Sequence, residues 1–203
     1  MNQPAQKPAR ARGRPRTFCE AAALDAAVRV FWEKGYDGAS LDDLTRAMGI
    51  GRPSLYAAFG DKRSLFLASL ERYGQTVGSC GIVGLARHAD VREAVTAFLE
   101  RLLASNLGAP RGCLVGSASG PSIGTIEGVD AMVRDMGATT EALLRDRFDA
   151  AREAGQLPSD FPSEERARLL ADLMHAQAFR ARTGEPRARL EAEIPAKVDA
   201  VLR

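Results

Sequence analysis

The chain has 203 residues, of which 45% are hydrophobic and 27% charged, and its formal net charge is +2. These proportions are ordinary for a folded globular protein, and no run approaches the roughly 20 apolar residues that a membrane-spanning helix requires. The polar, basic start of the chain lacks the apolar core of a secretory signal, so we expect a cytoplasmic protein with no membrane partner.

The first 18 residues are basic and contain no acidic side chain. The basic residues are Lys7, Arg10, Arg12, Arg14 and Arg16, and prolines interrupt the segment. Proline disfavours a helix, so we expect a flexible arm. Such an arm suits a polyanion, either nucleic acid or an anionic membrane surface, and it suits a solvated tail equally well.

Helical spacing of apolar residues dominates the rest of the chain, which predicts an all-α fold. A first helix is expected over residues 20–34, with Gly35 as its stop. Ser40 and Asp43 resemble a capping box that opens a second helix, and Gly49 ends it. A third, short helix follows, with Gly51 near its start.

Residues 40–59 therefore have the length and chemistry of a helix-turn-helix, whose second helix enters the major groove of DNA. Pro53 in the first turn of that helix is compatible with it. A generic helical hairpin with solvated polar residues has the same spacing. The side chains expected to face outward and reach DNA are Arg52, Ser54, Tyr56 and Ala57.

Further helices are expected along the remaining chain. Asp61 caps one that runs toward Cys80, and others span about 91–107, 129–154, 163–183 and 187–202. A Gly/Ser-rich stretch at 112–128 separates two of them. Pro195 is expected to kink or break the last one.

The residues around the predicted helix-turn-helix resemble a known family. Gly-Tyr-Asp-Gly-Ala-Ser-Leu at 35–41, Ala-Met-Gly-Ile at 47–50, and the segment 54–65 resemble the N-terminal signature of the tetracycline-repressor-like (TetR) family of bacterial transcriptional regulators. The match covers about residues 14–73. Ala57 and Ala58 stand where the family often has a bulky histidine, and Pro53 where glycine is frequent. These departures put the base preference in doubt.

The resemblance implies roles for matching residues. Ser40 and Lys62 would bind phosphates, Tyr56 would bind a phosphate or a base, and Arg14 and Arg16 would lie beside or in the minor groove. It also implies three parts: a basic arm (1–18), a three-helix DNA-binding domain (19–65) and a larger helical ligand-binding and dimerisation domain (66–203).

In that family the second domain forms a homodimer through its last two helices, and two half-sites about 34 Å apart give a physical reason for a dimer. The apolar residues of segment 163–183 support this, although they could equally close the core of a monomer. A small-molecule pocket is expected among helices of this domain, and ordinary core packing explains the same residues. The pocket candidates are Phe98, Leu102, Cys113, Leu114, Met132, Met136, Leu143 and His175.

The cysteines, Cys19, Cys80 and Cys113, have no metal-binding spacing, so we expect neither a metal nor a cofactor. Some family members sense electrophiles or oxidants through cysteines, and Arg111 precedes Cys113 closely. Cys113 or Cys80 could therefore tune DNA binding on modification, whereas an inert buried thiol is the plainer interpretation.

The sequence lacks a nucleophile elbow, a phosphate-binding glycine loop and a histidine-rich metal site, which argues against an enzyme. A helical interaction protein that uses its basic arm on membranes or acidic partners is the other alternative. We expect a ligand-responsive repressor that binds a palindrome-like double-stranded operator as a dimer and is released by a small molecule. The electrophile- or redox-responsive regulator is the variant of that hypothesis.

Overall fold

A computed structural model describes residues 19–108, 110 and 112–203, and within these residues every regular element is helical. The prediction of an all-α fold is confirmed. The α-helices, in chain order, are α1 (Glu20–Gly38), α2 (Leu41–Met48), α3 (Arg52–Phe59), α4 (Lys62–Tyr73), α5 (Cys80–Arg87), α6 (Val91–Asn106), α7 (Val129–Glu153), α8 (Ser163–Arg182), α9 (Arg187–Ala192) and α10 (Ile194–Leu202). Three short turns, η1 (Gly74–Gly78), η2 (Leu114–Ala118) and η3 (Gly120–Ser122), connect them.

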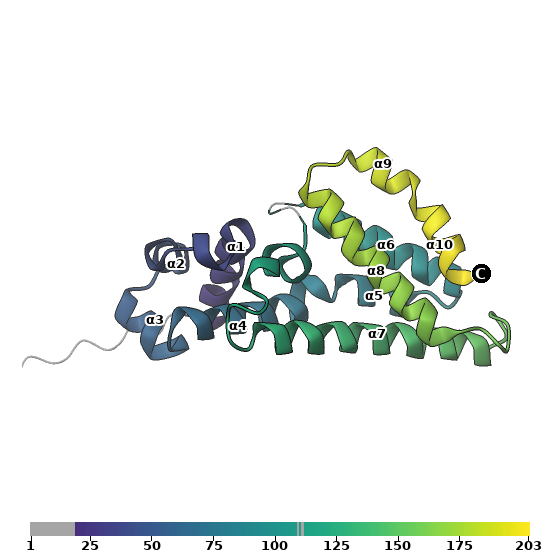
Figure 1. The fold of residues 1–203 in the computed structure, drawn as a ribbon, viewed down its shortest axis with the longest axis horizontal. Coiled ribbons are helices and arrows are strands. Elements are labelled where there is room, and N and C mark those ends of the chain that lie inside the picture. Colours follow the sequence, from purple (N-terminus) through teal and green to yellow (C-terminus); the bar gives the residue numbers. More distant parts are fainter. Residues whose placement is uncertain (1–18, 109, 111) are drawn as a thin grey trace, which may run out of the picture.

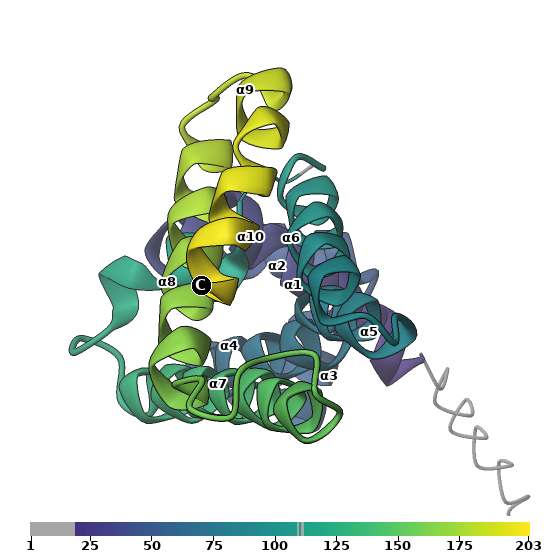
Figure 2. The same ribbon diagram turned by 90° about the vertical axis from the view of Figure 1, so that its right-hand side faces the viewer.

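The helices form an elongated molecule with two ends. Figure 1 shows α1, α2 and α3 gathered at one end, while α8, α9 and α10 lie toward the other and α7 runs along the length. In Figure 2, α8 and α10 lie together on one side, α5 and α6 on another, and α7 below them. The helices α2 and α3 thus lie at the end of the molecule opposite to α9 and α10.

An aromatic core holds α1 to α4 together. The Phe31 and Phe66 rings meet edge to face with centroids 4.9 Å apart, and Trp32 and Tyr73 do the same at 5.0 Å. This cluster also contains Leu114 from residues 112–128, the connector between α6 and α7 that includes η2 and η3. The predicted domain boundary at residues 65 and 66 therefore passes through α4, whose later turns still belong to this core.

A second core joins α5 to α10. Gly84 lets α5 approach α6 closely, since a Cβ there would lie 2.9 Å from the backbone oxygen of Ala97. Phe148 and Phe161 meet edge to face within the same core, with ring centroids 5.6 Å apart. The buried Gln177 of α8 donates a hydrogen bond to the backbone oxygen of Leu99, which ties α8 to α6.

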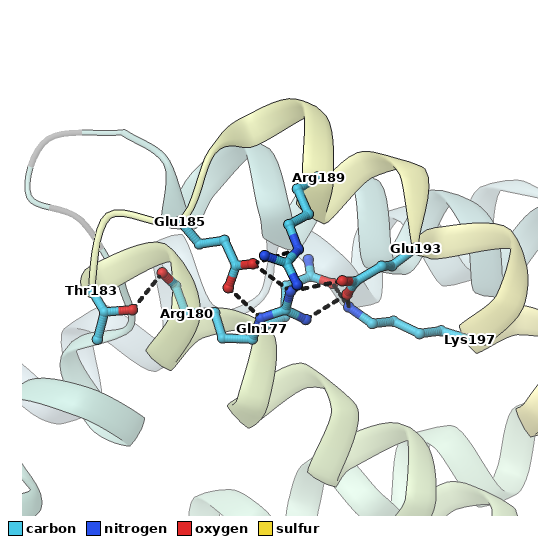
Figure 3. A network of polar contacts seen from close by, with 7 residues as sticks. All are labelled: Gln177, Arg180, Thr183, Glu185, Arg189, Glu193 and Lys197. Carbon is cyan, nitrogen blue, oxygen red and sulfur yellow. Dashed lines mark hydrogen bonds and ion pairs between the residues drawn. The ribbon is translucent and has the colours of Figure 1, made fainter.

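A polar network fixes the last two helices onto α8. Figure 3 shows the Arg180 guanidinium between the carboxylates of Glu185 and Glu193, at distances of 2.5–2.8 Å. Lys197 joins the same network through Glu193 at 3.4 Å and through Gln177 at 3.4 Å. The relative placement of α8, α9 and α10 is therefore set by charge-assisted hydrogen bonds as well as by apolar packing.

The element boundaries largely follow the predicted ones. Gly35 has φ 70° and interrupts α1 where a stop was expected, and Pro195 lies in the first turn of α10 after a break from α9. The helix expected from Asp61 to Cys80 is instead divided by the π-helical turn η1. No helix in the described part of the chain is long and apolar enough to cross a membrane.

Candidate nucleic-acid interface

The start of α2 is fixed by a reciprocal cap. The Ser40 hydroxyl accepts a hydrogen bond from the Asp43 backbone N–H at 3.1 Å, and the Asp43 carboxylate accepts one from the Ser40 backbone N–H at 3.2 Å. Lys34 pairs with the same carboxylate at 2.8 Å. Lys34 and then Ser40 hold the pKa of Asp43 well below its usual range, so the cap stays charged at neutral pH.

The turn between α2 and α3 uses glycine where the backbone requires it. Gly49 has φ 66° and ends α2, and Gly51 precedes α3, whose first turn accepts Pro53. The side chain of Leu55 is completely buried and anchors α3 to the core. These local signals were predicted from the sequence and are present in the structure.

The opposite face of α3 is open to solvent. The exposed residues are Arg52, Pro53, Ser54, Tyr56, Ala57 and Ala58. The Tyr56 side chain is 48% exposed despite its size, and few large apolar side chains of the described residues are as open. The small residues beside Tyr56 leave room for the edge of a DNA groove, and the Tyr56 hydroxyl can donate a hydrogen bond to a phosphate. The predicted outward face of the third helix is confirmed.

Arg52 is not free on this face. Its guanidinium donates to the Asp42 carboxylate of α2 at 2.9 Å. Both side chains are more than half exposed, so the pair contributes little to stability. A guanine contact by Arg52 must therefore share or replace the Asp42 carboxylate.

The start of α4 lies beside α3. Asp61 caps it by accepting a hydrogen bond from the Ser64 backbone N–H at 2.7 Å. The Lys62 ammonium lies over the Tyr36 ring, 4.4 Å from its centroid. Arg63 pairs with Glu127 of the loop before α7 at 2.5 Å. Lys62 thus lies at a helix N-terminus, where an anion is favoured.

The structure describes some of the residues predicted to contact DNA and leaves others outside its range. Ser40 is exposed, and its hydroxyl also donates to Asp43 at 2.7 Å, so a phosphate would compete for that proton. Arg14 and Arg16 lie outside the described residues, as does Arg111. Sequence reasoning missed Tyr36 as a partner of Lys62 and Asp42 as a partner of Arg52. An aromatic ring just after a helix-breaking glycine was the available signal for Tyr36.

The structure distributes the predicted pocket residues over several surroundings. Phe98 and Leu102 are buried in the second core, and Leu114 in the first. Met132 and Met136 of α7 are half-buried, and Leu143 is 43% exposed. Their role as pocket residues stays a prediction. Two open depressions lie elsewhere, one beside Leu107 and 184–187 and one between the end of α7 and the start of α8.

Cys113 and His175 do come together around η2. The Cys113 sulfur accepts a hydrogen bond from the Gly116 backbone N–H at 3.3 Å. A Cβ on Gly116 would lie 3.9 Å from that sulfur and 3.2 Å from the His175 ring. The Tyr73 side chain is hydrogen-bonded to Cys113, and burial, followed by this thiol, raises the pKa of Tyr73. Burial also raises the pKa of Cys80.

The same region joins the helix-turn-helix to the C-terminal helices. The Trp32 indole N–H donates to the backbone oxygen of Gly112 at 3.0 Å. Arg182 at the end of α8 donates to the backbone oxygen of Trp32 at 3.3 Å. Trp32 also packs on Tyr73, which contacts Cys113. A movement of the connector can therefore reach α1 directly.

Residues 23–69 match the family model described as bacterial regulatory proteins, tetR family. Over 64 residues the chain is 50% identical to the HTH-type transcriptional repressor ComR of Escherichia coli strain K12, covering 32% of this chain and 30% of ComR. Over 68 residues it is 46% identical to the repressor BdcR of the same strain, covering 34% of each. The aligned segments thus span about a third of these curated relatives.

Solved structures match over nearly the whole chain. A cysteine-substituted form of CifR, a TetR family transcriptional regulator complexed with 26-bp double-stranded operator DNA, is 35% identical with a TM-score of 0.85. That match covers 92% of this chain and 99% of CifR. A TetR regulator described as putative, from Rhodococcus sp. RHA1, is 31% identical with a TM-score of 0.61, covering 89% of this chain and 98% of that one.

Proposed function

Because the chain belongs to the TetR family of bacterial regulatory proteins, we propose that it is a dimeric transcriptional repressor that binds a palindrome-like operator and leaves it when a small molecule binds. The observation that carries the proposal is the solvent-open face of α3 beside the N-terminus of α4. The family consists of regulators, so the enzyme alternative is set aside. Operator DNA lies in the bacterial cytoplasm, and the repressor acts there.

On DNA, α3 enters the major groove with its N-terminus leading. Tyr56 and Lys62 bind phosphates on either side of the groove, and Ser40 binds a third from the start of α2. Arg52, Ser54 and Ala57 face the base edges, where Arg52 can pair with guanine and Ala57 can contact a thymine methyl group. Arg14 and Arg16 extend the contact into the minor groove.

The dimer forms through α8 together with α9 and α10. Phe179 on α8 is 62% exposed, and Ala176 lies one turn before it on the same face. Ala196 and Ala200 are exposed on α10, which packs beside α8. A large ring flanked by alanines allows two copies to approach closely and bury Phe179. Two recognition helices then address two half-sites.

Release by a ligand needs a path from the second domain to α3. Trp32 provides one, because it contacts the connector through Gly112 and α8 through Arg182. A ligand that moves the connector or the end of α8 shifts α1 and the helix α2 that packs on it, and α3 follows through its contacts with α2 and α4. A change of this kind alters the separation of the two recognition helices and weakens binding to both half-sites at once.

The second candidate is a regulator that responds to electrophiles or oxidants through Cys113. The specific observation in its favour is the contact of the Cys113 side chain with Tyr73, since Tyr73 packs directly on Trp32. A group added to the sulfur has to displace Tyr73 or the connector. Cys80 is the weaker choice because its sulfur faces the Arg101 backbone oxygen at 3.8 Å within the second core.

The test begins by selecting bound sequences from random DNA and measuring affinity for the selected site. Tyr56→Ala and Lys62→Ala are expected to weaken binding while the protein stays folded and dimeric. Unchanged affinity in both variants refutes the assignment of the interface. Small molecules are then screened for release from the operator, and N-ethylmaleimide is compared on the native protein and on a Cys113→Ser, Cys80→Ser protein. An identical response of the two proteins rejects the thiol mechanism.

A further inference from the structure

Tyr36 occupies an unusual place relative to the DNA-facing cations. Gly35, at φ 70°, interrupts α1 immediately before Tyr36. The ring lies under the first residue of α4, with the Lys62 nitrogen 4.4 Å from the ring centroid. A cation at this distance from an aromatic face is attracted by the negative charge density of the ring. Tyr36 thus contacts the lysine to which the proposed function gives a phosphate.

The Tyr36 ring is held rigidly. It stacks on Phe31 with an interplanar angle of 7° and a centroid separation of 6.4 Å, and it packs on Phe66 at 5.1 Å. Both phenylalanines are completely buried. The ring is therefore an extension of the hydrophobic core of the helix-turn-helix, and it offers a fixed surface to a flexible lysine.

The neighbouring cations are held in a different way. Lys34 pairs with Asp43, Arg52 with Asp42 and Arg63 with Glu127. Within residues 19–108, 110 and 112–203, Lys62 has no carboxylate at ion-pair distance. A carboxylate competes with a phosphate for the cation, whereas a ring face attracts it only weakly and leaves the N–H groups on the far side free.

We propose that Tyr36 is a positioning residue for DNA binding, which holds the Lys62 ammonium ready for an operator phosphate without neutralising it. The proposal rests on the proposed function, because it needs Lys62 to contact DNA. Because the Tyr36 ring already orders the Lys62 side chain, a phosphate contact by Lys62 costs less side-chain entropy than a contact by a free lysine. The hydroxyl of Tyr36 takes no part, so phenylalanine is expected to replace it.

The experiment measures the dissociation constant for the selected operator by fluorescence anisotropy, on full-length dimers. Loss of a cation–π contact of this exposed kind corresponds to about a 2- to 5-fold loss for each half-site, so Tyr36→Leu is expected to weaken dimer binding by about 4- to 25-fold. Tyr36→Phe is expected to stay within about twofold. In a Lys62→Ala protein, Tyr36→Leu is expected to cause no further loss.

Controls separate positioning from packing. Circular dichroism and thermal unfolding check that each variant is folded, and Tyr36→Met replaces Tyr36→Leu if the leucine protein is unstable. Arg46→Ala removes an exposed cation of α2 that lies at 3.9 Å from Asp43, and its effect is expected to multiply with that of Tyr36→Leu.

Two results overturn the proposal. If Tyr36→Leu weakens binding equally with and without Lys62, the tyrosine acts through packing alone. If Lys62→Ala itself binds the operator normally while Tyr56→Ala does not, the phosphate contact of Lys62 is wrong and the role of Tyr36 with it, but the helix-turn-helix assignment survives. A loss confined to proteins that retain Lys62 supports the proposal.

Discussion

Two glycines in helix interiors give opposite predictions for the same substitution. Alanine is favoured over glycine within a helix by about 0.5–1 kcal/mol, so a methyl group stabilises wherever there is room for it. At Gly137 in α7, a Cβ would meet no heavy atom within 4 Å. At Gly84 in α5, it would lie 2.7 Å from the Arg101 side chain and 2.9 Å from the Ala97 backbone oxygen.

Gly137→Ala is therefore expected to raise the free energy of unfolding by about 0.5–1 kcal/mol. Gly84→Ala is expected to lower it by about 0.5–2 kcal/mol, because overpacking against a backbone costs about 1–3 kcal/mol and exceeds the gain in helix propensity. Urea unfolding followed by circular dichroism, at one fixed protein concentration, measures both. If Gly84→Ala matches or exceeds the native stability, the close packing of α5 on α6 is not as described.

Three further predictions concern the polar contacts. Arg180 lowers the pKa of Glu193 to about 2, so the ionised carboxylate stabilises the fold fully above its ordinary pKa of 4.5. That stability is lost as the pH falls from about 4.5 to about 2. Acid titrations of unfolding are therefore expected to show a smaller loss of stability in Glu193→Gln than in the native protein. Arg52→Ala is expected to remove about 1–3 kcal/mol of discrimination at one base pair in a binding-site selection, and an unchanged preference shows that Arg52 does not read a base. Trp32→Phe leaves the Gly112 carbonyl without its indole donor, and thermal unfolding is expected to report a loss of about 1–3 kcal/mol. A Trp32→Phe protein of native stability shows that this bond contributes nothing.

Features that depend only on neighbouring residues could be predicted from the sequence. The capping box of Ser40 and Asp43, the left-handed Gly49 and the outward position of Tyr56 depend on residues within one or two helical turns. Local hydrogen bonds and helical periodicity fix such features before tertiary packing does. The break between α9 and α10 beside Pro195 belongs to the same group.

Features that depend on distant elements could not be predicted in this way. The π-helical turn η1 begins at Gly74, which faces Met136 of α7. A Cβ on Gly74 would lie 2.5 Å from the methyl carbon of Met136. The contact of Tyr36 with Lys62 joins the end of α1 to the start of α4. The Arg52–Asp42 pair likewise depends on how α3 crosses α2. Spacing alone cannot give these angles.

The surroundings of Cys113 and Leu143 also depend on distant elements and could not be predicted from the sequence. Cys113 was singled out from its immediate sequence, but its contact with Tyr73 and its nearness to His175 come from η2 folding back on α4 and α8. Leu143 was predicted to line a pocket because it is apolar and lies on a helix expected to surround the cavity, and its side chain is exposed on α7. Periodicity identifies an apolar residue without showing which neighbour covers it.

The most direct test of the central claim is the affinity of the full-length dimer for its selected operator as a function of salt, for the native protein and for Tyr56→Ala. A protein that anchors phosphates from α2, α3 and α4 at two half-sites is predicted to lose affinity linearly in log–log terms as salt rises, and Tyr56→Ala is predicted to bind more weakly at every salt concentration. Binding that ignores salt, or a Tyr56→Ala protein that binds as tightly as the native one, would contradict the account.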